Sequence, residues 1–162
     1  MAEPTRELRV RRMTWEAPGV LSLDLVAPDG SALPPFEPGA HLDLHLPGAP
    51  VRQYSLCGET DDTRSWRIAV REVEAGKASG LVHRALRPGA LVRAAGPRNN
   101  FPLSPSRRYV FVAGGIGITP ILPMLRAATR AGAGWTLLFC ARRAAEAPFL
   151  EEACAAGGEV VV

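Results

Sequence analysis

The sequence has few of the features that mark metal, disulfide or membrane proteins. Its three cysteines, Cys57, Cys140 and Cys154, are widely spaced and form no Cys/His pattern of the kind that binds metal. They are also too few for a disulfide scaffold. The longest uncharged stretch, 109–125, is shorter than the roughly 20 residues of a membrane span, and the charged start, 1–15, lacks the apolar segment of a secretion signal. We therefore expect a cytoplasmic protein with no metal site and no membrane partner.

Lysine is almost absent, and basic residues outnumber acidic ones only slightly. Lys77 is the only lysine among 19 basic residues, which face 16 acidic ones, and the net charge is +3. A nucleic-acid-binding protein normally has a denser and more one-sided basic patch. We therefore expect no nucleic-acid partner.

Up to about Leu103 the pattern predicts antiparallel β-structure. Leu21, Leu23 and Leu25 alternate with polar residues, and the apolar residues of 41–46 and 66–70 alternate in the same way. A period of two marks strands with one buried and one solvated face. Proline and glycine turns separate these short strands, and one helix is expected at about 79–86. The pattern predicts a small antiparallel Greek-key β-barrel over 1–103.

The pattern changes after a linker near 100–108. The apolar run 109–113 predicts a strand buried on both faces, and a glycine turn and a helix at about 120–131 follow it. Residues 135–140 predict a second buried strand, 144–156 a second helix, and 159–162 the start of a third strand. This β-α-β-α-β order predicts a parallel sheet with right-handed crossovers, and so a partial α/β domain over 104–162.

The turn after the first of these strands has glycines at 114, 115 and 117. Glycine lets the backbone turn sharply and approach a ligand closely. We expect Thr119 to cap the following helix and Pro120 to take its first position. Free N–H groups at a helix start suit a pyrophosphate. The spacing differs from Gly-x-Gly-x-x-Gly, and a tight turn that binds nothing explains the residues equally well.

A second candidate segment is the predicted strand 51–57. Arg52 can bind a phosphate or cover a ring, and Tyr54 combines an aromatic edge with a hydroxyl. Ser55 can hydrogen-bond the polar edge of a ring. These residue types suit a bound flavin. On composition alone, an ordinary strand with one surface arginine is the simpler interpretation.

Several motifs in order resemble the ferredoxin-NADP reductase superfamily. They are Arg-Gln-Tyr-Ser-Leu at 52–56 and Gly-Gly-Ile-Gly-Ile-Thr-Pro at 114–120. Between them, Gly-Pro-Arg-Asn-Asn-Phe-Pro-Leu at 96–103 is similar to the branch of phthalate dioxygenase reductase and vanillate O-demethylase reductase, as are 36–44 and 138–142. The resemblance runs from about Leu8 to the last residue. Each motif alone is weak, but the ordered set is specific.

The resemblance implies a flavin, FMN in this branch, with FAD possible because much of the superfamily uses it. Arg52 would lie near the phosphate, Tyr54 against the ring and Ser55 at its redox-active edge. A strand at 69–71 would run beside the flavin, and a helix starting after Gly76 would receive the phosphate. The implied flavin contacts are Arg52, Gln53, Tyr54, Ser55, Ala69, Val70, Arg71, Lys77, Ala78 and Ser79. Lys77 and Ala78 stand where the branch more often has glycine.

The resemblance also implies a nicotinamide dinucleotide, with NADH and NADPH both open. Its contacts would be Gly114, Gly115, Gly117, Thr119 and Pro120, with Arg142 or Arg143 at the adenosine ribose or its phosphate. Hydride would pass to the flavin, and electrons would pass singly to a 2Fe–2S centre. The partner would be an oxygenase component or a ferredoxin-type electron acceptor. No acid–base triad is expected, and no catalytic side chain is assigned.

A complete enzyme of this family does not fit into 162 residues. The family's Cys-Gly-Pro segment and its C-terminal ferredoxin domain, which would hold the 2Fe–2S centre, are absent from the sequence. We expect a truncated, NAD(P)H-dependent flavin oxidoreductase, the electron-transfer reductase component of an aromatic-ring oxygenase or O-demethylase system. The alternatives are a flavin-binding fragment without reductase activity, an FAD-type reductase of the wider superfamily, and a chain that fails to fold.

The remaining polar residues have simpler interpretations. His41 and His45 are expected on the solvated face of a strand, with no third metal ligand near them. Cys57 and Cys140 are expected to be small buried residues, and Cys154 to be incidental on a polar helix.

Overall fold

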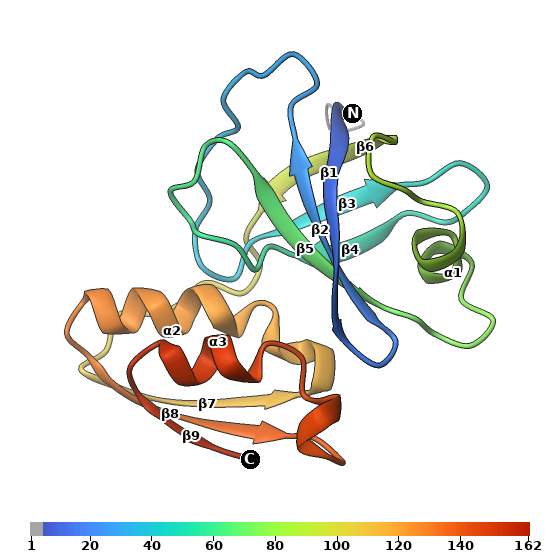
Figure 1. Ribbon diagram of the computed structural model, residues 1–162. Helices are drawn as coiled ribbons and strands as arrows, with labels where there is room; N and C mark the ends of the chain where they lie inside the picture. The colour runs from blue at the N-terminus through green and yellow to red at the C-terminus, as the bar shows by residue number, and fades with distance from the viewer. Residues whose placement is uncertain (1–4) are drawn as a thin grey trace.

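The computed structural model describes residues 5–162 and shows a β-rich half joined to an α/β half (Figure 1). Residues 1–4 lie outside the described residues. They belong to the segment 1–15, in which we expect no secretion signal. No helix in the described range is long and apolar enough to cross a membrane. The first half contains β1 (Thr5–Ala17), β2 (Val20–Val26), β3 (His41–His45), β4 (Arg52–Ser55), β5 (Trp66–Arg71), α1 (Lys77–Arg84) and β6 (Leu91–Arg98).

The six strands of this half form one antiparallel sheet in the order β4-β3-β6-β1-β2-β5. The two edges of the sheet meet where Leu56 forms a β-bridge with Ile68 and the Cys57 N–H donates to the Arg67 carbonyl at 2.8 Å. The sheet is therefore barrel-like. β6 returns over a long connection to lie beside β3, which is the Greek-key connection that the sequence predicts. The sequence pattern did not predict β6 itself.

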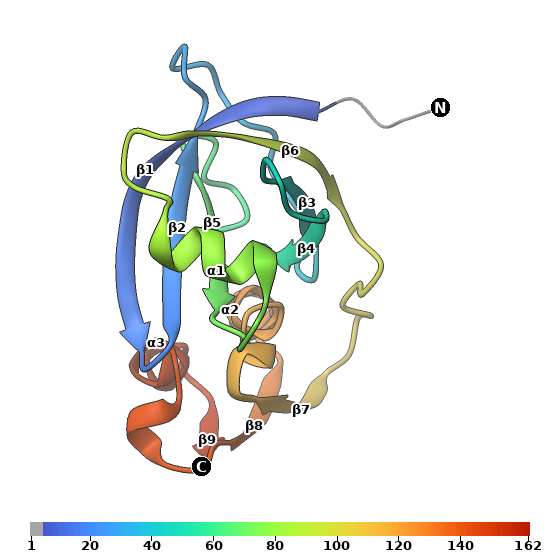
Figure 2. The same cartoon turned by 90° about the vertical axis from the view of Figure 1, so that its right-hand side faces the viewer.

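Alternation places one face of each strand inside this barrel. Leu23 and Leu25 of β2 and Leu42 of β3 are fully buried in one core with Trp66 of β5. α1 begins two residues earlier than expected and adds Ala78 and Val82 to the same core (Figure 2). The barrel therefore buries most of the apolar residues that the period-two pattern assigned to it, with Leu21 only partly buried.

The second half has the predicted parallel sheet, in the order β7-β8-β9. Its elements are β7 (Arg108–Gly114), a 3₁₀ turn (Gly115–Ile118), α2 (Ile121–Arg130), β8 (Gly134–Cys140), a second 3₁₀ turn (Ala144–Glu146), α3 (Leu150–Ala155) and β9 (Glu159–Val161). Both helices lie on the side of the sheet that faces the barrel (Figure 1).

The expectation that 109–113 is buried on both faces is wrong. Phe111 and Ala113 are buried, but Val110 is 69% exposed and Val112 is 64% exposed. Leu138 of β8 is exposed as well. The cause is that α2 and α3 cover only one face of this sheet (Figure 1).

The predicted helix 144–156 is also wrong, because it is interrupted. A short 3₁₀ turn ends at Glu146, and α3 starts only at Leu150. Pro148 lies in the gap, and Phe149 has a left-handed backbone with φ of 61°. Proline disfavours helical geometry in the residue before it, so the break has a cause that is visible in the sequence.

The two halves share a second core. Ala17, Val20, Cys57 and Ala69 of the barrel pack in the same buried cluster as α2 and the 3₁₀ turn before it. The segment between β6 and β7 has no regular secondary structure, as expected of the linker. Placing the boundary between the halves at 103/104 stays a prediction.

Candidate functional site

Four of the predicted flavin residues lie on β4, at one edge of the barrel sheet. Arg52 is exposed, and its guanidinium donates to the neighbouring Val51 carbonyl at 3.1 Å. Tyr54 is half-buried against the barrel core, and burial raises the pKa of its phenol. The hydroxyl therefore stays protonated at neutral pH and can donate a hydrogen bond. Ser55 is half-buried and faces His41 across the β3–β4 pair.

Gln53 has a role in the barrel wall. It lies opposite Asp43 on β3, which also forms a 2.5 Å ion pair with Arg98. Burial acts to raise the pKa of Asp43, but hydrogen bonds from Arg98 and Gln53 outweigh it and lower the pKa. Asp43 is therefore ionised at neutral pH and holds β3 against β6.

On β5 only one of the three predicted residues faces solvent. Ala69 and Val70 are buried, whereas Arg71 is exposed. The Val70 carbonyl lies 3.0 Å from His83 Nε2, which anchors α1 to β5. Ala69 and Val70 can therefore shape a site through their backbone and packing, whereas Arg71 can reach a ligand with its guanidinium.

The start of α1 suits a phosphate. Gly76 caps the helix without a side-chain hydrogen bond, and Lys77 beside it is exposed. Ser79 is buried, and its hydroxyl accepts from the Val73 N–H at 3.1 Å, so this hydroxyl supports the turn. Ala78 is buried in the barrel core. The backbone N–H groups of the first helical turn, with the Lys77 ammonium, are a donor set that fits an anion.

The glycine turn differs from the sequence expectation in one respect. Thr119 does not cap α2, because its buried hydroxyl donates back to the Ile116 carbonyl at 3.0 Å. Pro120 was expected to be the first residue of the helix, but it holds the cap position, and α2 starts at Ile121. Gly114 and Gly117 have open space where a Cβ would stand, so the backbone there is accessible to a ligand.

A pocket of about 370 Å³ opens between the two halves beside this turn. It brings together Arg71 of β5, Gly115 of the turn and Arg142 of the loop after β8. Gly115 has φ of 49°, and an added Cβ would lie 3.1 Å from the Arg71 guanidinium. The other lining residues are Pro18, Val20, Ile116, Cys140, Ala141, Glu146 and Pro148. Two guanidiniums beside a glycine turn are a donor set that fits a dinucleotide phosphate.

Two expectations from the sequence, a buried Cys140 and a solvated His41, are wrong. Cys140 is exposed and lines the pocket, because it ends β8 where the strand leaves the sheet. His41 is only 8% exposed, since β4 and β6 flank it, and its Nε2 has no hydrogen-bond partner among residues 5–162. Within the same range, no group of three His, Cys, Asp or Glu side chains could hold a metal ion.

Comparisons with known proteins agree with this geometry. The reductase subunit of a tert-butanol monooxygenase / tert-amyl alcohol desaturase from Aquincola tertiaricarbonis is 40% identical over 159 residues, which is 96% of this chain and 47% of that protein. A vanillate O-demethylase oxidoreductase from Pseudomonas putida is 44% identical over 138 residues, 84% of this chain and 43% of that protein. The solved structure of phthalate dioxygenase reductase superposes with a TM-score of 0.89 at 30% identity, over 97% of this chain and 51% of that one.

The chain belongs to the ferredoxin-NADP reductase superfamily, in the branch of phthalate dioxygenase reductase and vanillate O-demethylase reductase. No protein-family model matches it. The chain spans about half the length of the relatives it matches.

Within this reductase fold, several pocket residues were missed by sequence reasoning. Pro18 comes from the β1–β2 turn and Val20 from the start of β2. Glu146 and Pro148 come from the broken helix. Pro148 was the available signal, because a proline marks a loop that can line a pocket. Pro18 and Val20 gave no such signal, since their place depends on how the barrel meets the second half.

Proposed function

We propose that this chain is the flavin-binding part, and the first portion of the nicotinamide-binding part, of a reductase component. The component would serve an aromatic-ring oxygenase or an O-demethylase. The pocket that joins Arg71, Gly115 and Arg142 across the two halves carries the proposal. It lies where the exposed end of β5 meets the glycine turn, so a dinucleotide in the pocket would face the predicted flavin strands.

The flavin would rest against β4 and the start of α1. Arg52 and the first turn of α1 would bind its phosphate, because both present unshielded donors. Tyr54 would donate or pack against the ring, and Ser55 would hydrogen-bond its polar edge. FMN fits the branch, and FAD is the alternative. The complete predicted contact set is Arg52, Gln53, Tyr54, Ser55, Ala69, Val70, Arg71, Lys77, Ala78 and Ser79.

NADH or NADPH would bind at the glycine turn. The open backbone at Gly114 and Gly117 allows close approach, and Gly115 gives the turn its left-handed residue. Arg142 would reach the adenosine ribose or its phosphate. Thr119 and Pro120 would act by fixing the turn, since the Thr119 hydroxyl is engaged with Ile116.

A bound flavin would supply the chemistry, because it can accept a hydride from NAD(P)H and release electrons singly. The residues of the chain would bind the two cofactors and orient them relative to one another. A 2Fe–2S centre would receive the electrons in a further part of the protein, on the way to the oxygenase component or a ferredoxin-type acceptor. The three unpaired thiols suit a reducing compartment, so we place the protein in the cytoplasm.

Reconstitution with flavin tests the proposal. The chain is mixed with FMN or FAD, the bound flavin is identified by chromatography, and its bleaching by NADH or NADPH is followed anaerobically. We expect FMN to bind and to bleach. Bound flavin that no dinucleotide bleaches would favour a flavin-binding fragment, and no bound flavin at all would reject the proposal.

Matched variants then test the two sites. Arg52→Ala should raise the flavin dissociation constant about tenfold, because a charge-assisted hydrogen bond to phosphate is lost. Arg142→Gln should weaken dinucleotide binding by a similar factor. Arg107→Gln removes an exposed arginine that does not line the pocket, and it should leave both constants unchanged. Equal effects of all three changes would contradict the site assignment.

A further inference from the structure

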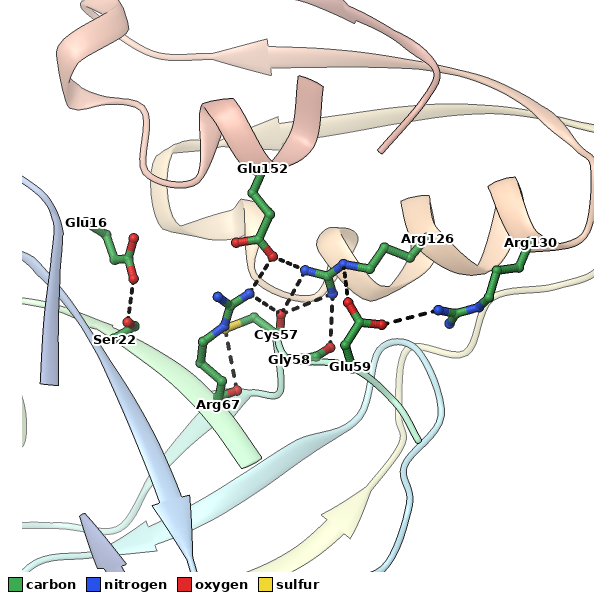
Figure 3. Close-up of polar contacts among 9 residues, drawn as sticks. All are labelled: Glu16, Ser22, Cys57, Gly58, Glu59, Arg67, Arg126, Arg130 and Glu152. Carbon is green, nitrogen blue, oxygen red and sulfur yellow. Dashed lines mark hydrogen bonds and ion pairs between the residues drawn. The ribbon is translucent and has the colours of Figure 1, made fainter. Parts of the chain in front are cut away.

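A cluster of charged groups joins the two halves (Figure 3). The barrel contributes Arg67 of β5 and the Cys57 and Gly58 carbonyls, which follow β4. The α/β half contributes Arg126 of α2 and Glu152 of α3. The cluster therefore links two elements of each half.

Two guanidiniums share the same two acceptors. Glu152 Oε1 lies 2.5 Å from Arg67 Nη2 and also accepts from Arg126 Nη2. The Cys57 carbonyl accepts from Arg67 at 2.8 Å and from Arg126 at 3.3 Å. Figure 3 shows both arginines converging on Glu152 and on this carbonyl. Glu152 is therefore the carboxylate that both guanidiniums contact.

The two arginines are shielded from water, so solvent weakens their electrostatic interactions with neighbouring groups less than it would at the surface. The side chains of Arg67 and Arg126 are 23% and 14% exposed. Burial acts to lower the pKa of Arg67, but its polar partners, Glu152 among them, outweigh burial and raise the pKa. The two guanidiniums would repel one another without counter-charges. Arg126 has a second carboxylate partner, because its Nε lies 3.0 Å from Glu59 Oε1 in the barrel half, whereas Arg67 pairs with Glu152 (Figure 3). Removing Glu152 would therefore leave Arg67 without its carboxylate partner, beside an Arg126 whose remaining partners all belong to the barrel half.

The elements tied together here are the ones that carry the candidate site. β4 runs into Cys57, and β5 carries both Arg67 and Arg71. α2 directly follows the glycine turn, and α3 follows the loop of Arg142 and Glu146. A displacement at the cluster would therefore move the turn and this loop relative to β4 and β5.

We propose that Glu152 is a positioning residue. By pairing with Arg67 and Arg126 at once, it fixes the dinucleotide-binding turn relative to the flavin-binding strands, and so it sets the approach of the two cofactors. The cofactor part of this inference rests on the proposed function, whereas the fixing of one half against the other does not. Glu152 does not line the pocket itself, so its effect is on geometry rather than on affinity.

The first test measures geometry without any cofactor. Spin labels are attached to Cys140, at the end of β8, and to a cysteine introduced by Leu91→Cys, which is exposed on β6. The background carries Cys154→Ser, and the buried Cys57 is not labelled. We expect one narrow distance in the otherwise unchanged chain. Glu152→Gln should at least double the width of the distribution or shift its centre.

The matched control is Glu151→Gln, on the same helix. Glu151 is exposed and forms no ion pair in the part of the chain that the structure describes, so the same loss of charge should leave the distance narrow. Arg126→Gln removes the other side of the contact and should broaden the distance as Glu152→Gln does. Circular dichroism establishes which variants fold. If Glu152→Gln does not fold, Arg126→Gln provides the same test.

The second test separates positioning from binding. In the unlabelled chain, Glu152→Gln should slow flavin reduction at saturating NADH about 10- to 100-fold, because small misplacements of reacting groups have effects of this size. Flavin and NADH dissociation constants should change less than twofold, and Glu151→Gln should match the unchanged chain.

Two outcomes would overturn the inference. A distance in Glu152→Gln as narrow and as centred as in Glu151→Gln would show that the carboxylate does not hold the halves. An unchanged reduction rate would show that the fixed geometry does not matter for electron transfer. If the unchanged chain binds flavin but never reduces it, the proposed function fails, and the distance comparison still decides whether Glu152 holds the two halves.

Discussion

The two halves of the molecule treat their apolar residues differently. In the barrel, Leu23, Leu25 and Leu42 lie inside a sheet whose edges nearly meet. In the α/β half, α2 and α3 cover one face of the sheet, and the other face exposes Val110 and Val112 (Figure 1). Apolar residues of similar type are thus core in one half and surface in the other. What decides between the two is the number of covering layers, which a strand pattern does not contain.

The largest effect should separate the two faces of the smaller sheet. Phe139→Ala removes a ring that is 1% exposed and should lower the free energy of unfolding by about 3–5 kcal/mol, through lost burial and a cavity. Val112→Ala on the open face should change it by less than about 0.5 kcal/mol. Urea unfolding measures both. A large cost at Val112 would show that this face is covered in solution.

A smaller effect tests whether the halves unfold together. Each has one buried tryptophan whose indole N–H donates, Trp66 to the Pro34 carbonyl at 3.1 Å and Trp135 to the Thr129 hydroxyl at 2.8 Å. Trp66→Phe and Trp135→Phe should each cost about 1–2 kcal/mol, because a hydrogen bond is lost and an acceptor is left unpaired.

These two variants also report on one half at a time. Fluorescence follows the α/β half in Trp66→Phe and the barrel in Trp135→Phe, with the exposed Trp15 common to both. After correction for each variant's own stability, fluorescence and circular dichroism should give one midpoint, because the halves share a core. Separate midpoints would show that the halves unfold independently.

Gly115→Ala should cost about 1 kcal/mol, since alanine is strained at a φ of 49°. It should also weaken dinucleotide binding by displacing Arg71. Gly117→Ala is the control for stability, because its Cβ would enter open space in the same turn. Thermal unfolding and a dinucleotide titration measure the two effects. Similar losses of stability in both variants would mean that the left-handed residue is not special.

The smallest effect concerns acid stability in the barrel. The pKa of Asp43 is lowered in the folded chain below its ordinary 3.8. Its stabilisation is therefore present above that ordinary value and is lost as pH falls through the folded pKa. Asp43→Asn should reduce the acid-dependent loss of stability, by less than about 1 kcal/mol because solvent screens the partly exposed Arg98. The control is Asp61→Asn, at an exposed position. Urea unfolding between pH 2 and 7 should give this variant the same dependence of unfolding free energy on pH as the unchanged chain.

Local pattern predicted the kinds of element well. Alternating leucines identified β2 and β3, and the glycine turn between a strand and a helix was placed correctly. The break at Pro148 was not predicted, although proline limits the residue before it and so gave a local signal. These features depend on neighbours along the chain, which is why the sequence carries them.

Features that depend on distant contacts were missed. His41 is buried because β4 and β6 flank it, and Cys140 is exposed because β8 ends beside a pocket. The cluster of Arg67, Arg126 and Glu152 joins residues up to 85 positions apart, so no spacing rule could have found it. Similarity of ordered motifs supplied the family, and the residue roles at the predicted site stay predictions.

Cys57 turns the junction into a chemical reporter. The thiol is fully buried among residues of both halves, and burial raises its pKa to about 12. A thiol in this state is shielded from alkylating reagents, whereas Cys140 and Cys154 are exposed. The rate at which Cys57 is alkylated therefore reports how often the junction between the two halves opens. Peptide mass spectrometry can measure this rate in the unaltered chain.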